Sequence, residues 1–235
     1  EAAAGGADLV VFPETFIPGY PVWMWRLRPG PDMSLTNELY GTLFENSVDL
    51  ESDDLGPLRT AAAEHSVTLV CGLNERDGSL SRGTLFNTVV VIGRDGAVLN
   101  RHRKLMPTNP ERMVHGFGDA SGLRAIDTPV GRIGTLLCWE NYMPLARYAL
   151  MEAGEQIHCS HFPGSLGGEP MVKLPAGMRH QPSVQLAVTL SVAWSCVATS
   201  PPVSGTPWSS SPDTAWTITV RSRSPNEVSV AMARL

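Results

Sequence analysis

The sequence predicts an α/β protein in which helices cover a sheet, and three observations lead to this class. Short apolar runs typical of buried strands alternate with segments that have helical patterning. A hairpin turn signal, Arg94-Asp95-Gly96, lies between two of the apolar runs. The chain has 235 residues, 43% of them hydrophobic, which suits one sizeable globular domain.

The expected elements follow one another along the first two-thirds of the chain. Each expected strand is an apolar run bounded by loop residues, and each expected helix has apolar residues at helical spacing. The expected strands are residues 7–12, 66–73, 85–92, 97–103, 131–137 and 156–161. The expected helices are residues 35–48, 56–65 and 142–153, the last of them closed by Gly154.

The two ends of the chain differ in character from the rest. Residues 1–4 resemble the end of a helix closed by Gly5-Gly6, which suggests a missing N-terminal segment. Between residues 191 and 225, 19 of 35 residues are Ser, Thr or Pro. We therefore predict a partial domain over residues 1–180 and an atypical segment over residues 181–235. In that segment we expect a strand or helix at residues 184–197 and a strand at residues 214–220.

Composition and charge exclude several function classes. The net charge of −5 offers no basic surface, so nucleic acid is not an expected partner. No apolar run is long enough to span a membrane, and no signal peptide is visible. The four cysteines are too few and too widely spaced for a disulfide scaffold. We therefore expect reduced thiols and a cytoplasmic protein.

Three chemically functional residues directly follow expected strands. Glu14 comes just after the first strand, Lys104 after the strand that ends at residue 103, and Cys138 after the strand that ends at residue 137. Loops at strand ends project reactive groups from a rigid scaffold. The three side chains converge if these strands are neighbours and parallel, which the sequence alone does not prove.

Cys138 stands between an apolar strand and an expected helix, with no linker. A sharp strand-to-helix turn would expose its thiol, and the N–H groups at the helix start would favour a thiolate. The N–H of Trp139 would also stabilise negative charge that develops on a substrate. The alternative is a small buried core residue, as most cysteines are, and position alone leaves the two interpretations equal.

The charged candidates have structural alternatives as well. Glu14 is expected to be buried, which raises a carboxylate pKa and improves a general base; its alternative is a helix cap or a partner for an arginine. Lys104 ends a basic run that could instead be a solvated edge. Glu111 could hold Lys104 in place or assist proton transfer, and a salt bridge to Arg112 or Arg103 is the alternative.

His158, Cys159 and His161 lie close together in the sequence. Adjacent positions on a strand face opposite sides, and His158 and His161 differ in facing as well. We therefore expect no metal site there. A Cys–His dyad of the protease kind has no local signature in this sequence.

Three motifs in this chain resemble those of the nitrilase superfamily of carbon–nitrogen hydrolases. Phe12–Pro21 is similar to its glutamate motif, His102–Thr108 to its lysine motif and Gly134–Asn141 to its cysteine motif. The three stand in the family's order, and the resemblance covers about residues 7–164. Cys-Trp-Glu-Asn followed by Met143–Leu145 resembles the nitrilase branch, whereas amidase branches usually differ after the cysteine.

The resemblance implies a fold and a set of site residues. The fold would be an αββα sandwich subunit, with two subunits pairing into a four-layer assembly and thus a homo-oligomer. Cys138 would be the nucleophile, Glu14 the base and Lys104 the cationic stabiliser, with Glu111 as a further glutamate and the Trp139 N–H at the oxyanion. No metal and no organic cofactor would be needed.

The activity implied by the resemblance is hydrolysis of an organic nitrile to the carboxylic acid and ammonia. It would proceed through a thioimidate and a thioester on the cysteine. An amidase or carbamoylase with the same triad is the first alternative, and an inactive fragment that serves in binding or assembly is the second. Tyr20, Trp23 and Trp25 follow the glutamate motif and are expected to line the substrate pocket.

The sequence departs from the family at both ends. The first strand and most of the first helix of the family are absent, and the tail rich in Ser, Thr and Pro does not match the family's core strands. A reading-frame shift, or a divergent end in a partial gene, would explain the tail. Translation of the other two frames tests the reading-frame shift, because that explanation requires family-like strands in one of them.

Overall fold

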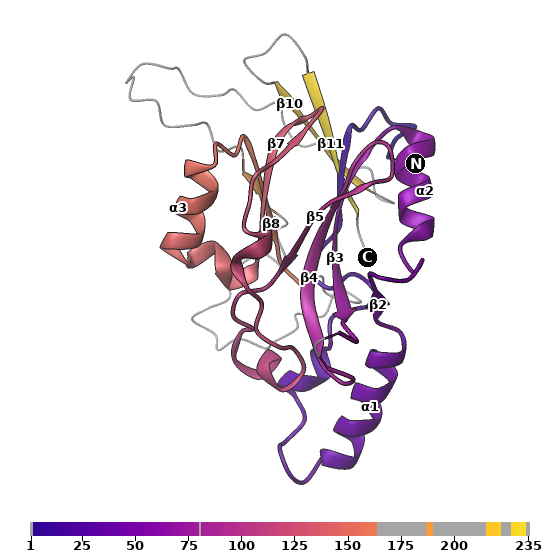
Figure 1. Ribbon diagram of the computed structural model, residues 1–235, viewed down its shortest axis with the longest axis vertical. Coiled ribbons are helices and arrows are strands. Elements are labelled where there is room, and N and C mark those ends of the chain that lie inside the picture. The colour runs from indigo at the N-terminus through magenta and orange to yellow at the C-terminus, as the bar shows by residue number, and fades with distance from the viewer. Residues whose placement is uncertain (1, 80, 164–186, 190–214, 222–226, 234–235) are drawn as a thin grey trace.

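Two β-sheets face each other and carry helices on their outer faces in the computed structural model, which describes residues 2–79, 81–163, 187–189, 215–221 and 227–233 (Figure 1). The elements in chain order are β1 (Leu9–Val11), η1 (Val22–Trp25), α1 (Met33–Glu45), β2 (Val48–Asp49), α2 (Gly56–His65), β3 (Thr68–Arg76), β4 (Leu85–Ile92), β5 (Val98–Arg103), η2 (Asn109–Met113), η3 (Ala120–Gly122), β6 (Ile126–Thr128), β7 (Gly131–Leu137), η4 (Cys138–Tyr142), α3 (Pro144–Glu152), β8 (Ile157–His161), β9 (Ala187–Thr189), β10 (Ala215–Arg221) and β11 (Glu227–Ala233). The η elements are short 3-10 helices.

The first sheet has the strand order β10-β11-β1-β3-β4-β5, and β2 pairs with β3. The second sheet has the order β6-β7-β8-β9. Strand β1 runs parallel to β3, whereas β3, β4 and β5 pair in antiparallel fashion. Strands β1 and β5 therefore run in the same direction, with β3 and β4 between them. In the second sheet β7 and β8 are parallel.

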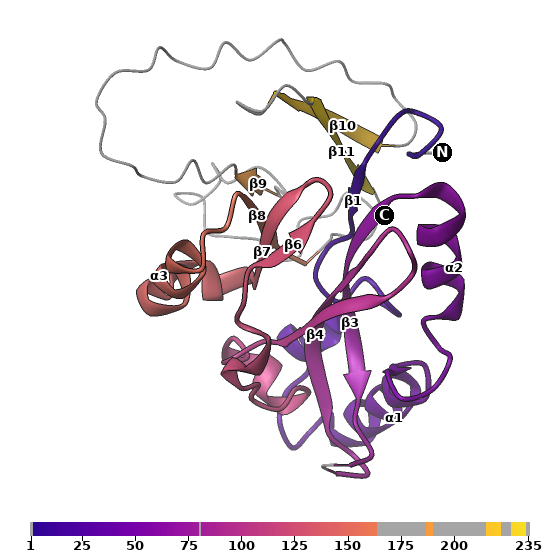
Figure 2. The same cartoon turned by 45° about the horizontal axis from the view of Figure 1, so that its top comes forward.

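Successive apolar cores hold the layers together. One core lies between α2 and the first sheet and includes Ala62, Val10 and Val90. A second lies between the two sheets, where Leu9 and Val89 meet residues of β7 and β8. A smaller one packs α3 on the second sheet. Figure 2 shows α1 and α2 outside the first sheet and α3 outside the second. The predicted αββα sandwich is therefore confirmed.

The layering explains why the strands are continuous apolar runs and do not alternate between apolar and polar residues. Every residue of β4 is buried. Val90 and Ile92 face the helix-side core, whereas Val89 and Val91 face the other sheet. A strand covered on both faces needs apolar side chains at successive positions.

Most element predictions are confirmed with shifted boundaries, and three of the shifts have a clear physical reason. The helix expected at residues 35–48 is α1 and ends at Glu45, because Val48 leaves it to pair with Glu75 of β3. The strand expected at residues 66–73 is β3 and begins later, because Ser66 takes a left-handed conformation that ends α2. The helix expected at residues 142–153 is α3, which starts at Pro144, a residue suited to the first helical position.

The tail supplies strands to both sheets. Strand β11 pairs in parallel with β1 and in antiparallel fashion with β10, so the strand predicted at residues 214–220 is confirmed. Strand β9 lies within residues 184–197, where a strand or a helix was expected. The other residues of that segment lie outside the described part of the chain. The domain boundary at residue 180 lies outside the described residues and stays a prediction. Among the described residues, no helix combines the length and apolar character needed to cross a membrane.

Candidate active site

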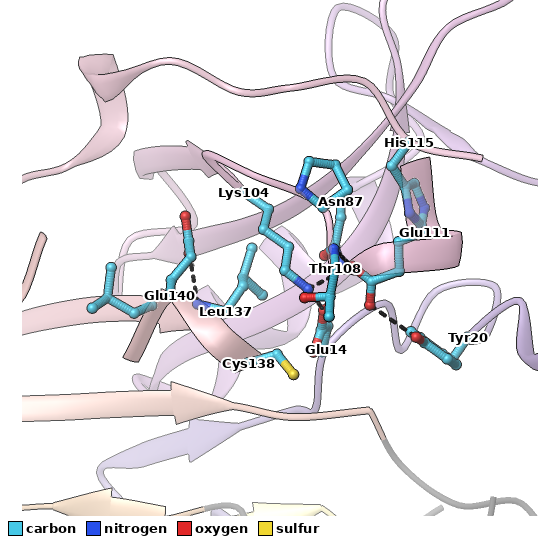
Figure 3. A network of polar contacts seen from close by, with 12 residues as sticks. Glu14, Tyr20, Asn87, Lys104, Thr108, Glu111, His115, Leu137, Cys138 and Glu140 are labelled. Atoms are coloured by element: carbon cyan, nitrogen blue, oxygen red, sulfur yellow. Dashed lines mark hydrogen bonds and ion pairs between the residues drawn. The ribbon is translucent and has the colours of Figure 1, made fainter. Parts of the chain in front are cut away.

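Glu14, Lys104 and Cys138 come together at one place between the two sheets (Figure 3). Glu14 follows β1 and Lys104 follows β5, two parallel strands of the first sheet that are not neighbours. Cys138 follows β7 of the second sheet. The condition considered for convergence, neighbouring parallel strands, is therefore not met. The residues converge because the two sheets face each other.

The Glu14 segment crosses from the first sheet to the second. The N–H of Phe12 donates to the Val70 carbonyl of β3, whereas the N–H of Glu14 donates to the Phe162 carbonyl just after β8. His161 adds a hydrogen bond of 2.9 Å from Nδ1 to the Phe12 carbonyl. These bonds place Glu14 at the border between the sheets, where the Cys138 turn also lies.

Lys104 forms a buried ion-pair cluster with two carboxylates. Its Nζ donates to Glu14 Oε1 and to Glu111 Oε2, each at 2.7 Å. Lys104 is 1% exposed, so it does not lie on a solvated basic edge. Burial opposes its charge, but the two carboxylates outweigh burial and raise the pKa of Lys104. The ammonium group therefore stays charged across the physiological range.

The two carboxylate oxygens of Glu14 differ in their hydrogen bonding. Its Oε1 accepts from Lys104 and also from Asn87 Nδ2, the latter at 2.6 Å. Within the described residues Oε2 has no hydrogen-bond partner, although it is buried. Burial raises the pKa of Glu14 to about 7, against the lowering effect of Lys104. Glu14 is therefore a carboxylate that can take up a proton near neutral pH.

Glu111 is held by donors on both oxygens. Tyr20 Oη donates to Oε1 at 2.8 Å, and Oε2 accepts from the Thr108 N–H and from Lys104, both at 2.7 Å. Trp25 Nε1 in turn donates to Tyr20 Oη at 2.9 Å. Burial raises the pKa of Tyr20, with a contribution from the carboxylates, so its hydroxyl keeps its proton. Glu111 is thus placed to hold Lys104. These partners are not the arginines of the alternative interpretation, a salt bridge to Arg112 or Arg103.

The two arginines of that alternative have other partners. Arg103 binds Glu75, with Nε donating to Oε2 at 2.9 Å, and also pairs with Asp77. Arg112 Nε donates to the Pro107 carbonyl at 3.1 Å.

Cys138 lies in a strained backbone conformation, with φ at 50°. Left-handed geometry is uncommon for a residue other than glycine, and such residues cluster at functional sites. The turn directs the side chain toward Glu14 (Figure 3). The Trp139 N–H interacts with the sulfur and lowers its pKa, whereas the Trp139 side chain is exposed.

The prediction of a favoured thiolate is wrong for the resting state. Burial raises the pKa of Cys138 to about 12, and Glu14 adds to this effect, while Lys104 opposes it. The five-residue η4 that follows is also too short to supply a large helix dipole. The thiol therefore stays protonated until a base removes its proton.

Two glycines allow backbone to approach backbone at the site. A Cβ on Gly72 of β3 would lie 2.3 Å from the Pro13 carbonyl oxygen and 2.7 Å from the Glu14 Cα. A Cβ on Gly118 would lie 2.3 Å from the Arg103 carbonyl oxygen. Because no side chain fits in these gaps, the segments carrying Glu14 and Lys104 lie directly against their supports.

Three polar residues of the site were missed in the sequence. Asn87 donates to Glu14, Glu140 accepts from backbone N–H groups on either side, and Asn141 Nδ2 donates to the Cys138 carbonyl at 2.8 Å. A signal existed for each of them. Asn87 interrupts an apolar strand, and the other two belong to the cysteine motif.

The remaining aromatic and histidine candidates divide between the site and other parts of the fold. Tyr20 and Trp25 join the site through Glu111. Trp23 packs against the apolar cluster of Met24 and Leu43, which Tyr20 also contacts. His158 binds Glu155 and Asn141, each at 2.8 Å. Among the described residues, no group of three or more His, Cys, Asp or Glu side chains is arranged to hold a metal ion.

Chemically, the site combines three complementary groups. A buried carboxylate with a free oxygen can accept a proton, a protonated thiol next to it can supply one, and a fixed ammonium group can stabilise negative charge. Fold and site together define an α/β sandwich equipped for covalent catalysis through a thiol.

Comparison with known proteins gives the family. Residues 1–184 match the carbon–nitrogen hydrolase family. A nitrilase of Paraburkholderia phymatum is 45% identical over 168 residues, which are 72% of this chain and 47% of that protein. An aliphatic nitrilase of Rhodococcus rhodochrous is 41% identical over 172 residues, which are 73% of this chain and 45% of that protein.

A solved structure supports the fold. The crystal structure of a carbon–nitrogen hydrolase from Helicobacter pylori G27 has a TM-score of 0.51 at 24% identity, over 70% of this chain and 51% of that chain. The chain belongs to the carbon–nitrogen hydrolase family, and the predicted membership of the nitrilase superfamily and its nitrilase branch is confirmed. It matches less than half the length of the two nitrilases.

Proposed function

We propose that this chain carries the active site of a nitrilase, which hydrolyses an organic nitrile to the carboxylic acid and ammonia. The observation that carries the proposal is the buried cluster in which Lys104 bridges Glu14 and Glu111 beside the Cys138 thiol. The relatives named as nitrilases at 41–45% identity support the choice of substrate class.

The first half of the proposed reaction forms a covalent intermediate. Glu14 takes the thiol proton on its free Oε2, and the thiolate of Cys138 attacks the nitrile carbon. Glu14 passes this proton on to the nitrile nitrogen, which gives a thioimidate and restores the carboxylate. Lys104 and the Trp139 N–H stabilise the negative charge that develops during attack. The raised pKa of the thiol makes the carboxylate base necessary.

The second half releases the two products. Water loses a proton to Glu14 and adds to the thioimidate carbon. Glu14 returns this proton to the nitrogen, the added hydroxyl gives up its own proton as the carbonyl forms, and the carbon–nitrogen bond breaks to release ammonia. A second water, activated in the same way, attacks the remaining thioester. The carbon–sulfur bond breaks, the acid leaves and the thiol of Cys138 is restored. Glu111 takes no proton in this scheme, because donors already occupy both of its oxygens.

A substrate panel tests this function. The expressed chain should release ammonia from small aliphatic or aromatic nitriles faster than from the matching amides. The variant Cys138→Ala should lose this activity by about four orders of magnitude or more, because the covalent route disappears. Faster turnover of amides would favour an amidase instead. Ammonia release that survives in Cys138→Ala would refute the assignment of the nucleophile.

We also propose that the protein is a homo-oligomer that associates through α3. Apolar side chains that are half exposed or more form one continuous stretch of η4 and α3, and they are Trp139, Tyr142, Leu145, Tyr148 and Met151. Exposed apolar patches of this kind mark interfaces, and two copies related by a twofold axis would cover each other's patches.

A cytoplasmic location is also proposed, and the free thiols of Cys71, Cys138 and Cys159 support it.

The oligomer is tested by molar mass. Leu145 is 83% exposed on α3, so Leu145→Glu should lower the molar mass measured by light scattering without unfolding the chain. Leu35→Glu on α1 is the matched control, since Leu35 is also exposed but lies on another helix. An equal mass for Leu145→Glu and the unaltered chain would contradict association through α3.

A further inference from the structure

Glu140 is a completely buried carboxylate two residues after Cys138, and the proposed reaction gives it no chemical step. Burial of a charge is costly unless hydrogen bonds compensate for it. The partners of Glu140 therefore indicate why a carboxylate stands at this position.

The Glu140 carboxylate joins the two segments that carry reactive groups. Its Oε1 accepts from the N–H of Leu105 at 2.6 Å, and its Oε2 accepts from the N–H of Leu137 at 2.8 Å. Leu105 directly follows Lys104, and Leu137 directly precedes Cys138. Figure 3 shows Glu140 against Leu137 at the Cys138 turn.

His102 completes the arrangement from the end of β5. Its Nε2 lies 3.2 Å from Oε1 and 3.1 Å from Oε2 of Glu140. The imidazole is completely buried. Glu140 thus has three donors, two of which belong to the segment around Lys104 and one to the segment around Cys138.

These bonds connect the two sheets at the site. Strand β5 belongs to the first sheet and β7 to the second, and the two share no backbone hydrogen bonds in the described sheets. Hydrogen bonds to an ionised carboxylate are short and strong. A displacement of Lys104 by about 1 Å is enough to lower catalysis strongly, so a fixed link between these segments matters.

We propose that Glu140 is a positioning residue that sets the distance between the Lys104 ammonium group and the Cys138 sulfur. It acts through the backbone on either side and touches neither substrate nor reacting atoms. This inference deepens the proposed function and rests on it for turnover, but its effect on the thiol can be measured without any nitrile.

The first test is the alkylation rate of Cys138 by iodoacetamide at one mildly alkaline pH, with the modified peptide identified by mass spectrometry. Glu140→Gln keeps one acceptor oxygen and turns an amide group toward the second N–H, so the link breaks. Lys104 then moves away and stabilises the thiolate less. We expect alkylation to slow by about fivefold or more, since each unit of pKa changes the thiolate fraction about tenfold.

The direction of the change in alkylation rate separates a positioning role from two alternatives. If Glu140 acted only by its negative charge, its removal would favour the thiolate and alkylation would become faster. If it only stabilised the fold, the folded variant would react at the unaltered rate. Either result would overturn the proposal.

Three further variants complete the design. Lys104→Met gives the decrease expected for full loss of the ammonium group, and Glu64→Gln removes an exposed carboxylate on α2 and should change nothing. Glu140→Asp keeps both oxygens on a shorter side chain, so we expect an intermediate rate. If Glu140→Gln does not fold, Glu140→Asp replaces it in the test. An alkylation rate equal to that of the unaltered chain would then overturn the proposal.

Turnover provides the second test. Glu140→Gln should lower kcat for a nitrile by about tenfold or more and change KM little, because ground-state binding does not depend on the Lys104–Cys138 distance. A chain that releases no ammonia even when unaltered contradicts the proposed function, yet the alkylation test of Glu140 still stands. The two failures are therefore distinguishable.

Discussion

The two sides of the site are stabilised in opposite ways. The lysine side consists of Glu14, Asn87, Lys104 and Glu111, and the cysteine side is the segment Leu137–Asn141. On the lysine side, short hydrogen bonds and ion pairs compensate for the buried charges. On the cysteine side, Cys138, the proposed nucleophile, has a left-handed backbone and a protonated thiol, and its neighbours Glu140 and Asn141 hold it through the backbone.

The lysine side is the rigid half of the site, and the cysteine side is the half that changes during the proposed reaction. The lysine side keeps charges fixed before the reaction starts, which is how preorganised sites stabilise a transition state. The cysteine side holds strain and a neutral thiol, which in the proposed reaction becomes reactive when Glu14 removes its proton. Changes on the lysine side should therefore cost stability as well as activity.

The largest expected effect in this comparison comes from Lys104→Met. It leaves Glu14 and Glu111 buried without their shared cation, so the free energy of unfolding should fall by about 3–5 kcal/mol. The value of kcat/KM should fall about a thousandfold. Urea unfolding and nitrile kinetics measure the two effects.

Arg101→Met is the control for Lys104→Met, because Arg101 lies in the same basic run but is exposed. It should cost less than about 1 kcal/mol and leave kcat/KM unchanged. If Lys104→Met unfolds at the same urea concentration as Arg101→Met, the lysine side is not the stabilised half of the site.

The pH dependence of activity sharpens the same comparison. Glu14 must be ionised to accept the thiol proton, and its pKa is raised to about 7. The value of kcat/KM should therefore rise with pH up to about 7 and fall about tenfold per pH unit below it. Lys104 stays protonated over this range. A profile that is flat down to the ordinary glutamate pKa of 4.5 would show that Glu14 is not the base.

The smallest expected effect concerns the support of Glu14 and not its charge. Gly72→Ala places a Cβ 2.3 Å from the Pro13 carbonyl oxygen, which should lower stability by about 1–3 kcal/mol. Displacement of Glu14 should lower kcat by about tenfold or more. Thermal unfolding and nitrile kinetics would measure both.

Gly78→Ala is the matched control for Gly72→Ala, since a Cβ at Gly78 meets nothing within 4 Å among the described residues. It should leave kcat unchanged. Equal kinetics for the two variants would mean that the close backbone contact at Gly72 does not position Glu14.

Much of the fold could be predicted because its signals are local. The apolar run of β4 is bounded by loop residues, and its predicted limits of Leu85 and Ile92 are those observed. The turn at Asp95-Gly96 and the left-handed Gly154 after α3 also follow from local preferences. Two of the limits that failed, at Val48 and Ser66, depend on pairing with β3 and on a helix cap, which neighbouring residues alone do not reveal.

The sequence was enough to single out Glu14, Lys104 and Cys138, which stand in recognisable motifs after predicted strands, and Glu111 shortly after the lysine motif. That these groups meet, and how, depends on the tertiary structure. The two sheets bring the lysine side and the cysteine side face to face, burial raises the pKa of the thiol, and Glu140 joins the segments around Lys104 and Cys138. The physical reason is that burial and contacts between distant segments depend on the packed layers, whereas motifs and apolar runs depend on nearby residues.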